Sequence, residues 1–297
     1  MNKHTVRPLI GVLLILAAAV VAACRAENTA SASAETETVA KPDAEDRVRC
    51  EGTAEVKKDS IRDGVPARVL EALDRLEKLG ETIKDLQAEL KLEKLETLVA
   101  DRTIKEGQLY YQRNKKKIRF RVSFETTLND RLPIADPEHF VFADGWLRWR
   151  QERIKREDHY QVTRPGQPST DLMRIGKSPL PIPIGQKTED VLKNFQVSLI
   201  DPDKKIDPAK VKSVHLKLVP RKGTELAMSH MRLEFWMACE GYLPIRSQWE
   251  NDSGDIFTAD MTKVQINKNI KDRIFKLSKL PRDYEFKAHP LPEEPDK

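Results

Sequence analysis

The feature that most constrains this chain is an alternation of apolar and polar residues that recurs along its sequence. Residues 118–125 read IRFRVSFE, and residues 231–237 read MRLEFWM. Successive side chains of a β-strand point to opposite faces, so each such segment has one apolar and one polar face. Residues 214–219, 245–249 and 257–266 alternate less regularly. The pattern predicts an antiparallel sheet with one face exposed to water.

A tight hairpin is predicted in the middle of this series. Asp144 and Gly145 separate FVFA at residues 140–143 from WLRW at residues 146–149. Asp-Gly readily takes the left-handed backbone conformation that a two-residue hairpin turn requires, so this is the strongest hairpin signal in the chain. Residues 85–93 also alternate strictly. We expect a strand there, with the extension of a preceding helix as the alternative.

Helical spacing appears in one region before these strands. Apolar residues recur at three- and four-residue intervals from Val69 to Leu79, after Pro66 and before Gly80. Proline at the start and glycine at the end of such a segment predict an amphipathic helix. Between residues 165 and 195 prolines interrupt regular structure. We expect a loop there that lies over the sheet and ends in a short helix at residues 188–195.

The N-terminus carries the pattern of an export signal. Basic residues precede an uncharged apolar run at residues 9–23, which is typical of a secretory signal peptide. The run is short for a membrane span. A buried N-terminal helix is the alternative. We therefore expect residues 1–23 to be removed and the mature protein to lie outside the cytoplasm.

The residue at which the signal ends decides whether the protein is anchored. Val21-Ala22-Ala23-Cys24 resembles the lipobox of bacterial lipoproteins, in which the cysteine receives a lipid. Ordinary cleavage at Ala30-Ser31-Ala32 is the alternative. Residues 24–50 contain little that could form a core and predict a disordered tether. Residues 51–290 are then one folded domain, and residues 291–297 a polar tail.

Because the number of cysteines is odd, one of them has no partner for a disulfide within the chain. The chain has three cysteines, and an oxidising compartment permits disulfides. If Cys24 carries lipid, Cys50 and Cys239 can pair with each other. The alternative is that both are free and buried.

The sequence argues against several classes of function. The chain has 52 basic and 47 acidic residues, interspersed, which does not indicate nucleic-acid binding. Its glycines are too far apart for a dinucleotide fingerprint, a phosphate-binding loop or a nucleophile elbow. Its histidines and cysteines form no local metal-binding pair. We expect no catalytic residues, metal or cofactor, although a catalytic group assembled from distant residues remains open.

The order of several short motifs resembles the outer-membrane lipoprotein carrier family, which includes a periplasmic carrier and an anchored acceptor. The resemblance spans residues 65–287 and includes the predicted N-terminal helix. The motifs are GQLYY at residues 107–111, RFR at 119–121, FADGWL at 142–147, IFKL at 274–277 and LPRDY at 280–284. The resemblance implies a mainly β, unclosed antiparallel half-barrel. In this family a helical lid covers an apolar cavity that receives the acyl chains of lipoproteins.

The resemblance also suggests which residues would line such a cavity. The strand pattern places ten apolar side chains on the inward face, and for each one a packed core is the alternative. They are Phe120, Val122, Phe124, Phe140, Phe142, Leu147, Met231, Leu233, Phe235 and Met237. Arg113 stands where the family has an Arg-Pro lid latch, although Asn114 replaces the proline.

Three hypotheses for function follow. The first is a monomeric carrier or acceptor of acylated lipoproteins or lipids in the periplasm or cell envelope, directed toward the outer membrane and anchored there through Cys24. The second is a non-catalytic envelope sensor or protein-interaction module on the same fold. The third is a periplasmic hydrolase with dispersed catalytic residues. The anchor favours a tethered acceptor over a soluble shuttle.

Overall fold

A computed structural model shows a mainly β protein built on one large sheet. It describes residues 61–62, 64–114, 117–129, 132–164, 167, 185–200, 212–228 and 230–292. The signal, the tether, Cys24, Cys50 and most of the proline-rich loop lie outside these residues, so the predictions for them stay untested. No described helix is long and apolar enough to cross a membrane.

The sheet has twelve strands in the order β14-β8-β7-β6-β5-β4-β3-β13-β12-β11-β10-β9. All neighbours are antiparallel except β14 and β8, which are parallel. The end strands β14 and β9 do not pair, so the barrel is unclosed, as expected. The bounds are β3 Asp85–Glu96, β4 Asp101–Asn114, β5 Lys117–Asn129, β6 Leu132–Ala143, β7 Trp146–Gln151, β8 Arg156–Gln161, β9 Phe195–Ile200, β10 Ser213–Pro220, β11 His230–Ala238, β12 Pro244–Asn251, β13 Ile256–Ile266 and β14 Glu285–His289.

Local signals placed several elements correctly. Helix α2 spans Ala67–Thr82, directly after Pro66, and helix α3 spans Thr188–Asn194. The alternating residues 85–93 belong to β3 and do not extend the helix. The Asp-Gly turn joins β6 to β7, with φ of 51° at Asp144 and 85° at Gly145. Smaller elements are β1 Ile61–Arg62, β2 Val65–Pro66 and the 3-10 helices η2 Glu225–Met228 and η3 Asp272–Phe275.

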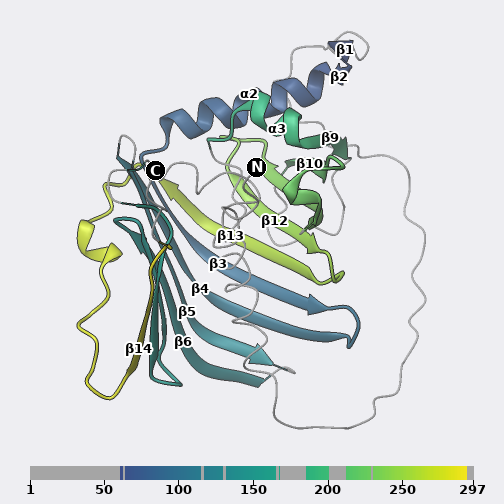
Figure 1. Ribbon diagram of the computed structural model, residues 1–297. Helices are drawn as coiled ribbons and strands as arrows, with labels where there is room; N and C mark the ends of the chain where they lie inside the picture. The colour runs from purple at the N-terminus through teal and green to yellow at the C-terminus, as the bar shows by residue number, and fades with distance from the viewer. Residues whose placement is uncertain are drawn as a thin grey trace.

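We call the side of the sheet that carries both helices the inner face. Cross-strand partners share a face, and their register traces the inner face from strand to strand. Ala88 pairs with Leu109, Leu109 with Val122, Val122 with Phe140, and Phe140 with Trp149. Figure 1 shows the strands bending beneath α2 and α3.

Two groups of buried residues lie on the inner face. The helix-covered cluster joins the apolar side of α2 to Leu216, Leu218, Leu233 and Phe235 on β10 and β11. The aromatic cluster lies on β3 to β8 and β13 and includes four phenylalanines. Of the residues of the two helices, only Leu79 packs against the aromatic cluster.

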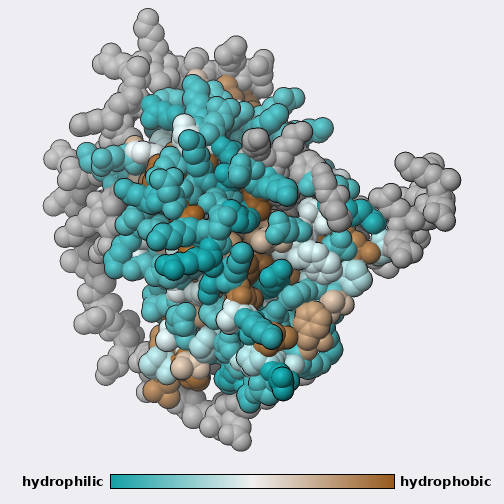
Figure 2. All heavy atoms as spheres, turned by 90° about the vertical axis from the view of Figure 1, so that its left-hand side faces the viewer, coloured by the Kyte–Doolittle hydropathy of each residue, from teal (hydrophilic) through white to brown (hydrophobic). Residues whose placement is uncertain are grey.

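The opposite, outer face is crossed by residues 267–289, which we call the C-terminal strap. It leaves β13, crosses β3 to β7, and ends as β14 beside β8. Lys268 and Asn269 donate backbone N–H groups to Asp85 at 2.8 and 3.0 Å, and Ile270 accepts from Gln112 at 3.1 Å. Figure 2 shows that the side of the molecule on which the strap lies is mostly hydrophilic, with scattered apolar patches.

Candidate functional site

The space beneath the helices is a packed core. A pocket there is lined by residues of α2, α3, β10 and β11 together with Gln186, and its cavity volume is about 10 Å³. A cavity of that size holds at most one water molecule. Leucine and phenylalanine side chains from the helices and the sheet fill the rest. The structure therefore shows no room for an acyl chain at this position. The lining residues are Leu73, Leu76, Gln186, Val191, Leu216, Leu218 and Phe235.

The aromatic cluster gathers most of the predicted inward residues. Phe120 stacks on Phe142 with ring centroids 5.5 Å apart, and Phe140 stacks on Trp149 at 5.6 Å. All cluster members are at most 8% exposed. Such stacked pairs add to the stabilisation that burial provides. The predicted residues in this cluster are Phe120, Val122, Phe124, Phe140, Phe142 and Leu147.

The other four residues that were predicted to face inward lie outside the aromatic cluster. Leu233, Phe235 and Met237 are buried in the helix-covered cluster, away from the aromatic one. Met231 is 57% exposed, so its prediction as an inward residue is wrong. The register between β11 and β12 shifts between His230 and Arg232, which leaves Met231 as the extra residue of a β-bulge. A bulge interrupts the alternation on which the prediction relied.

Charged side chains occupy one end of the inner face, and sequence reasoning missed them. Lys105 and Glu138 form an ion pair at 2.5 Å, with both side chains 4% exposed. Trp149 donates its indole N–H to Glu138 at 2.7 Å. Lys94 pairs with Glu96 at 2.5 Å. The period-two rule could have found both lysines, because each alternates with apolar residues of its own strand.

Arg113, the proposed latch residue, connects the sheet to α2. Its guanidinium donates to the backbone carbonyl of Glu81 at 2.9 Å, within the last turn of the helix. Its backbone N–H donates to the carbonyl of Lys84 at 2.7 Å. A cation near a helix C-terminus is favoured by the helix dipole and satisfies a free carbonyl. The residue therefore lies where a latch would act, while the latch role stays a proposal.

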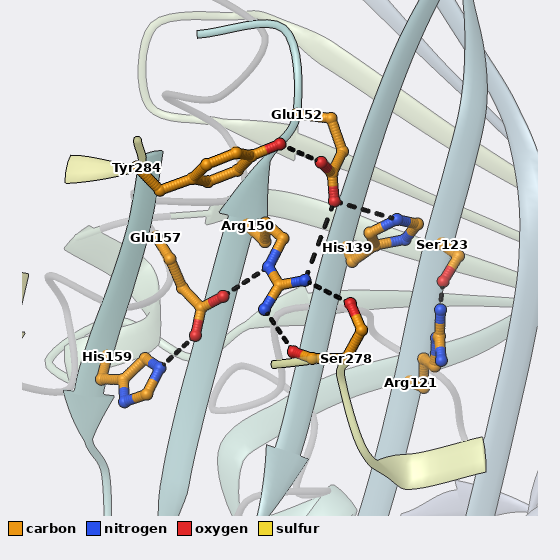
Figure 3. Close-up of polar contacts among 9 residues, drawn as sticks. All are labelled: Arg121, Ser123, His139, Arg150, Glu152, Glu157, His159, Ser278 and Tyr284. Carbon is orange, nitrogen blue, oxygen red and sulfur yellow. Dashed lines mark hydrogen bonds and ion pairs between the residues drawn. The ribbon is translucent and has the colours of Figure 1, made fainter. Parts of the chain in front are cut away.

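The outer face holds a connected polar network beneath the strap. Figure 3 shows the guanidinium of Arg150 among Glu157, Glu152 and Ser278. Arg150 forms an ion pair with Glu157 and donates to the hydroxyl and carbonyl of Ser278 at 2.9 and 2.8 Å. Tyr284 donates its hydroxyl to Glu152. These bonds hold the strap to β7 and β8.

The pKa shifts in this network have identifiable causes. Burial alone would raise the pKa of Glu157, but hydrogen bonds from His159 and Arg150 outweigh it and lower the pKa below its usual value. Burial, assisted by the charge of Arg121, lowers the pKa of His139. Both groups have structural partners, and neither faces a cleft that the described residues line. Among the described residues, no group of three or more histidine, cysteine or acidic side chains is placed to hold a metal ion.

Cys239 lies just beyond β11 and is disulfide-bonded. The other two cysteines of the chain, Cys24 and Cys50, both lie outside the described residues. Pairing of Cys239 with Cys50, which leaves Cys24 for a lipid, therefore remains a prediction.

Comparison with known proteins gives similarities of fold. No protein-family model and no curated protein matches the sequence. A putative outer membrane lipoprotein-sorting protein domain from Vibrio parahaemolyticus is 9% identical, with a TM-score of 0.31 over 70% of this chain and 96% of that one. Mycobacterium tuberculosis lipoprotein LppX is 8% identical, with a TM-score of 0.39 over 69% and 98%. A chain of the Pseudomonas aeruginosa MucA/MucB complex is 12% identical, with a TM-score of 0.41 over 71% of this chain and 61% of that one. The chain is similar to these structures in fold alone.

Proposed function

We propose that this protein is an exported, non-catalytic binding protein that shelters acyl chains of lipids or lipoproteins on the inner face of its sheet. The observation that supports this most is the aromatic cluster, which forms a continuous apolar surface over β3 to β8 and β13. Only Leu79 of the described helices packs on it. Flat aromatic side chains provide a large apolar area that a flexible chain can lie along.

The energetics of acyl chains fit such a surface. Each methylene removed from water contributes about 0.8 kcal/mol, so a chain of about sixteen carbons gains on the order of 12 kcal/mol from complete burial. The core beneath the helices is too tightly packed to accept it. The ligand would therefore lie along β3 to β8, with its far end near the C-terminal end of α2.

Access to this surface would require a movement. The aromatic side chains are at most 8% exposed, so a ligand reaches them only when packed elements separate. Arg113 ties the last turn of α2 to β4 through Glu81, next to the start of this surface. We assign Arg113 the role of a latch that holds α2 down until a ligand arrives. Release of α2 would be a hinge motion around the ends of β3 and β4.

The place of action follows from the N-terminal sequence. The apolar run before Cys24 has the pattern of a signal peptide, and the lipobox-like residues favour an anchored protein. The proposed role is thus a tethered acceptor or local carrier in the envelope that passes acylated cargo toward the outer membrane. The intact mass of the mature protein tests this part: a diacylglyceryl mass on Cys24 supports it, and an unmodified start beyond that residue contradicts it.

Binding itself is tested with a fluorescent acyl probe and two matched phenylalanine variants. Phe120 lies in the aromatic cluster, whereas Phe275 is buried at 2% exposure under Arg119 on the outer face. We expect Phe120→Ala to weaken probe binding about tenfold or more, because a buried aromatic side chain contributes about 1.5–3 kcal/mol. Phe275→Ala should lower stability and leave probe affinity near that of the wild type.

Three results of this experiment would decide against acyl binding on the inner face. The wild type could fail to bind the probe, both variants could bind equally well, or Phe275→Ala could have the larger effect on affinity. A protein partner that binds the wild type while the probe does not would favour the interaction-module hypothesis.

A further inference from the structure

The C-terminal strap holds most of the excess positive charge of the chain. Residues 267–289 contain seven basic and three acidic side chains, a net charge of +4, and the whole chain has a net charge of +5. All seven basic side chains are exposed. They belong to the hydrophilic side of the molecule that Figure 2 shows. The strap is therefore a concentrated patch of positive charge on a chain whose other charges nearly balance.

The acidic side chains of the strap do not neutralise this patch. Asp272 pairs with Arg119 of β5 at 2.7 Å, and Asp283 pairs at 2.8 Å with Lys155, which precedes β8. The third acid, Glu285, pairs at 2.7 Å with the lysine two residues further on. The other six basic side chains of the strap form no ion pair with a described residue. They are Lys268, Lys271, Arg273, Lys276, Lys279 and Arg282.

The strap is attached to the sheet without the help of these six cations. The backbone carbonyl of Ile274 accepts a hydrogen bond from Arg121 at 3.1 Å. The carbonyl of Ser278 accepts one from Arg150 at 2.8 Å, and Phe275 is 2% exposed. The sheet beneath the strap thus adds more positive charge, and like charges repel one another. Stability of the fold does not account for the six exposed cations.

We propose that the strap docks on a membrane surface that contains anionic phospholipids, with its six unpaired cations facing the headgroups. Clusters of about four to eight lysine and arginine side chains bind such surfaces. The strap crosses the sheet from β3 to β8, which is roughly 24 Å, so its cations can contact several headgroups at once. The proposal goes beyond acyl binding and does not depend on it, because it concerns the opposite face of the sheet.

Two exposed apolar side chains favour a lipid surface over another polyanion. Phe286 of β14 is 50% exposed, and Ile154, in the turn between β7 and β8, is 54% exposed. The two segments are joined where the backbone N–H of Glu285 donates to the carbonyl of Lys155 at 2.8 Å. Apolar side chains next to cations suit the boundary between headgroups and acyl chains. The export signal and the lipobox-like residues predicted at the N-terminus would bring the chain to such a surface.

The test measures how the mature chain co-sediments with lipid vesicles. Every sample carries Cys24→Ser, so that no attached lipid anchors the protein independently of its charge. The vesicles contain either phosphatidylcholine alone or phosphatidylcholine and phosphatidylglycerol in a two-to-one mixture. We expect binding to the mixed vesicles to be tighter by about tenfold or more, and high salt to abolish this preference by screening the charges.

A triple variant of the strap shows whether these cations are responsible. Lys271→Gln/Lys276→Gln/Lys279→Gln removes three exposed charges that have no partner among the described residues. At roughly fivefold for each charge, its binding to the mixed vesicles should be weaker by about a hundredfold. Its binding to phosphatidylcholine alone and its urea unfolding should remain those of the wild type.

The matched control removes the same charge from the opposite side of the molecule. Lys78 of α2, Lys187 before α3 and Lys193 of α3 are exposed on the side that carries the helices. Lys78→Gln/Lys187→Gln/Lys193→Gln should change binding to the mixed vesicles by about twofold at most, because these charges lie beyond the range of screened interactions.

Three results would overturn the proposal. The wild type could bind both kinds of vesicle equally well, or the two triple variants could lose the same affinity, which would make net charge and not the strap responsible. An oligoglutamate peptide could bind the wild type while the mixed vesicles do not, which would assign the patch to an acidic protein. A chain that binds the mixed vesicles through the strap but fails to bind an acyl probe would support this proposal and contradict the proposed function alone.

Discussion

The two halves of the sheet bury their inner faces in different ways. Over β9 to β11 the face is mostly aliphatic and is covered by α2 and α3, which leave a cavity of about 10 Å³. Over β3 to β8 the face is aromatic, receives only Leu79 from the described helices, and ends in the Lys105–Glu138 pair. One half is thus an aliphatic core covered by helices, while the other combines an equally buried aromatic surface with buried charge.

The outer faces differ as well. The strap binds β3 to β8, where Arg119, Arg121 and Arg150 contact its residues. A sheet that must open on its inner face gains support when its outer face is held by a separate segment. Under the proposed function, we call the strapped half the working half and the helix-covered half the structural half.

Truncation in the structural half should give the largest loss of stability. Phe235 is 1% exposed and lies beneath α2 and α3. Phe235→Ala should lower the free energy of unfolding by about 3–5 kcal/mol, because it removes a buried ring and leaves a cavity. Urea denaturation measures this. A loss below about 1 kcal/mol would mean that this half is loosely packed and would remove the contrast between the halves.

Local sequence signals were sufficient for part of this architecture. Pro66, the leucine spacing and the Asp144–Gly145 turn each act within a few residues, and α2 and the β6–β7 hairpin appear where they predict. Gly107 was noted only as part of a motif. The structure explains it: a Cβ there would lie 1.8 Å from the carbonyl oxygen of Ser123, so the close approach of β4 and β5 excludes any side chain.

Long-range features could not be predicted in this way. Lys105 and Glu138 are 33 residues apart, and only the pairing of three strands brings them together. The strap contacts strands more than 100 residues earlier in the chain, as in the bond from Arg150 to Ser278. The bulge at Met231 depends on the register with β12. Each of these is decided by tertiary packing, which alternation within one strand does not encode.

The strap offers the next test of the contrast. In Arg150→Leu the buried carboxylate of Glu157 keeps His159 but loses its guanidinium partner, and Ser278 loses two hydrogen bonds. We expect the free energy of unfolding to fall by about 3 kcal/mol. Hydrogen exchange should accelerate more in β14 than in β9 and β10. Arg150→Leu/Glu157→Leu should recover much of the loss. Equal exchange increases in both halves would show that the strap stabilises the whole sheet and not the working half alone.

A smaller effect is expected at the latch. Arg113→Ala removes the bond to the Glu81 carbonyl, which should lower stability by about 0.5–1.5 kcal/mol. The specific result is faster hydrogen exchange in the last turn of α2 and faster uptake of an acyl probe. Arg102→Ala, which breaks an exposed pair with Glu93, is the control and should change neither rate. Unchanged uptake in Arg113→Ala would leave Arg113 with a purely structural role.

Protonation distinguishes the halves least, because in each half burial lowers the pKa of a histidine. Burial lowers the pKa of His139 beneath the strap and of His230 on β11. A histidine whose folded pKa lies below the unfolded value of about 6.5 contributes stability above that pH. As the pH falls below about 6.5, the unfolded chain takes up the proton first, so this stability is lost at up to about 1.4 kcal/mol per pH unit for each histidine. Unfolding measured at pH 7 and pH 5.5 should therefore show that His139→Gln and His230→Gln each lose less stability in acid than the wild type does.

Hydrogen exchange then assigns the effect to one half of the sheet. His139→Gln should reduce the acid sensitivity of exchange in β14, and His230→Gln that of exchange in β11. If His230→Gln instead protects β14, the two halves unfold as one unit, and the division between them applies to ligand binding alone.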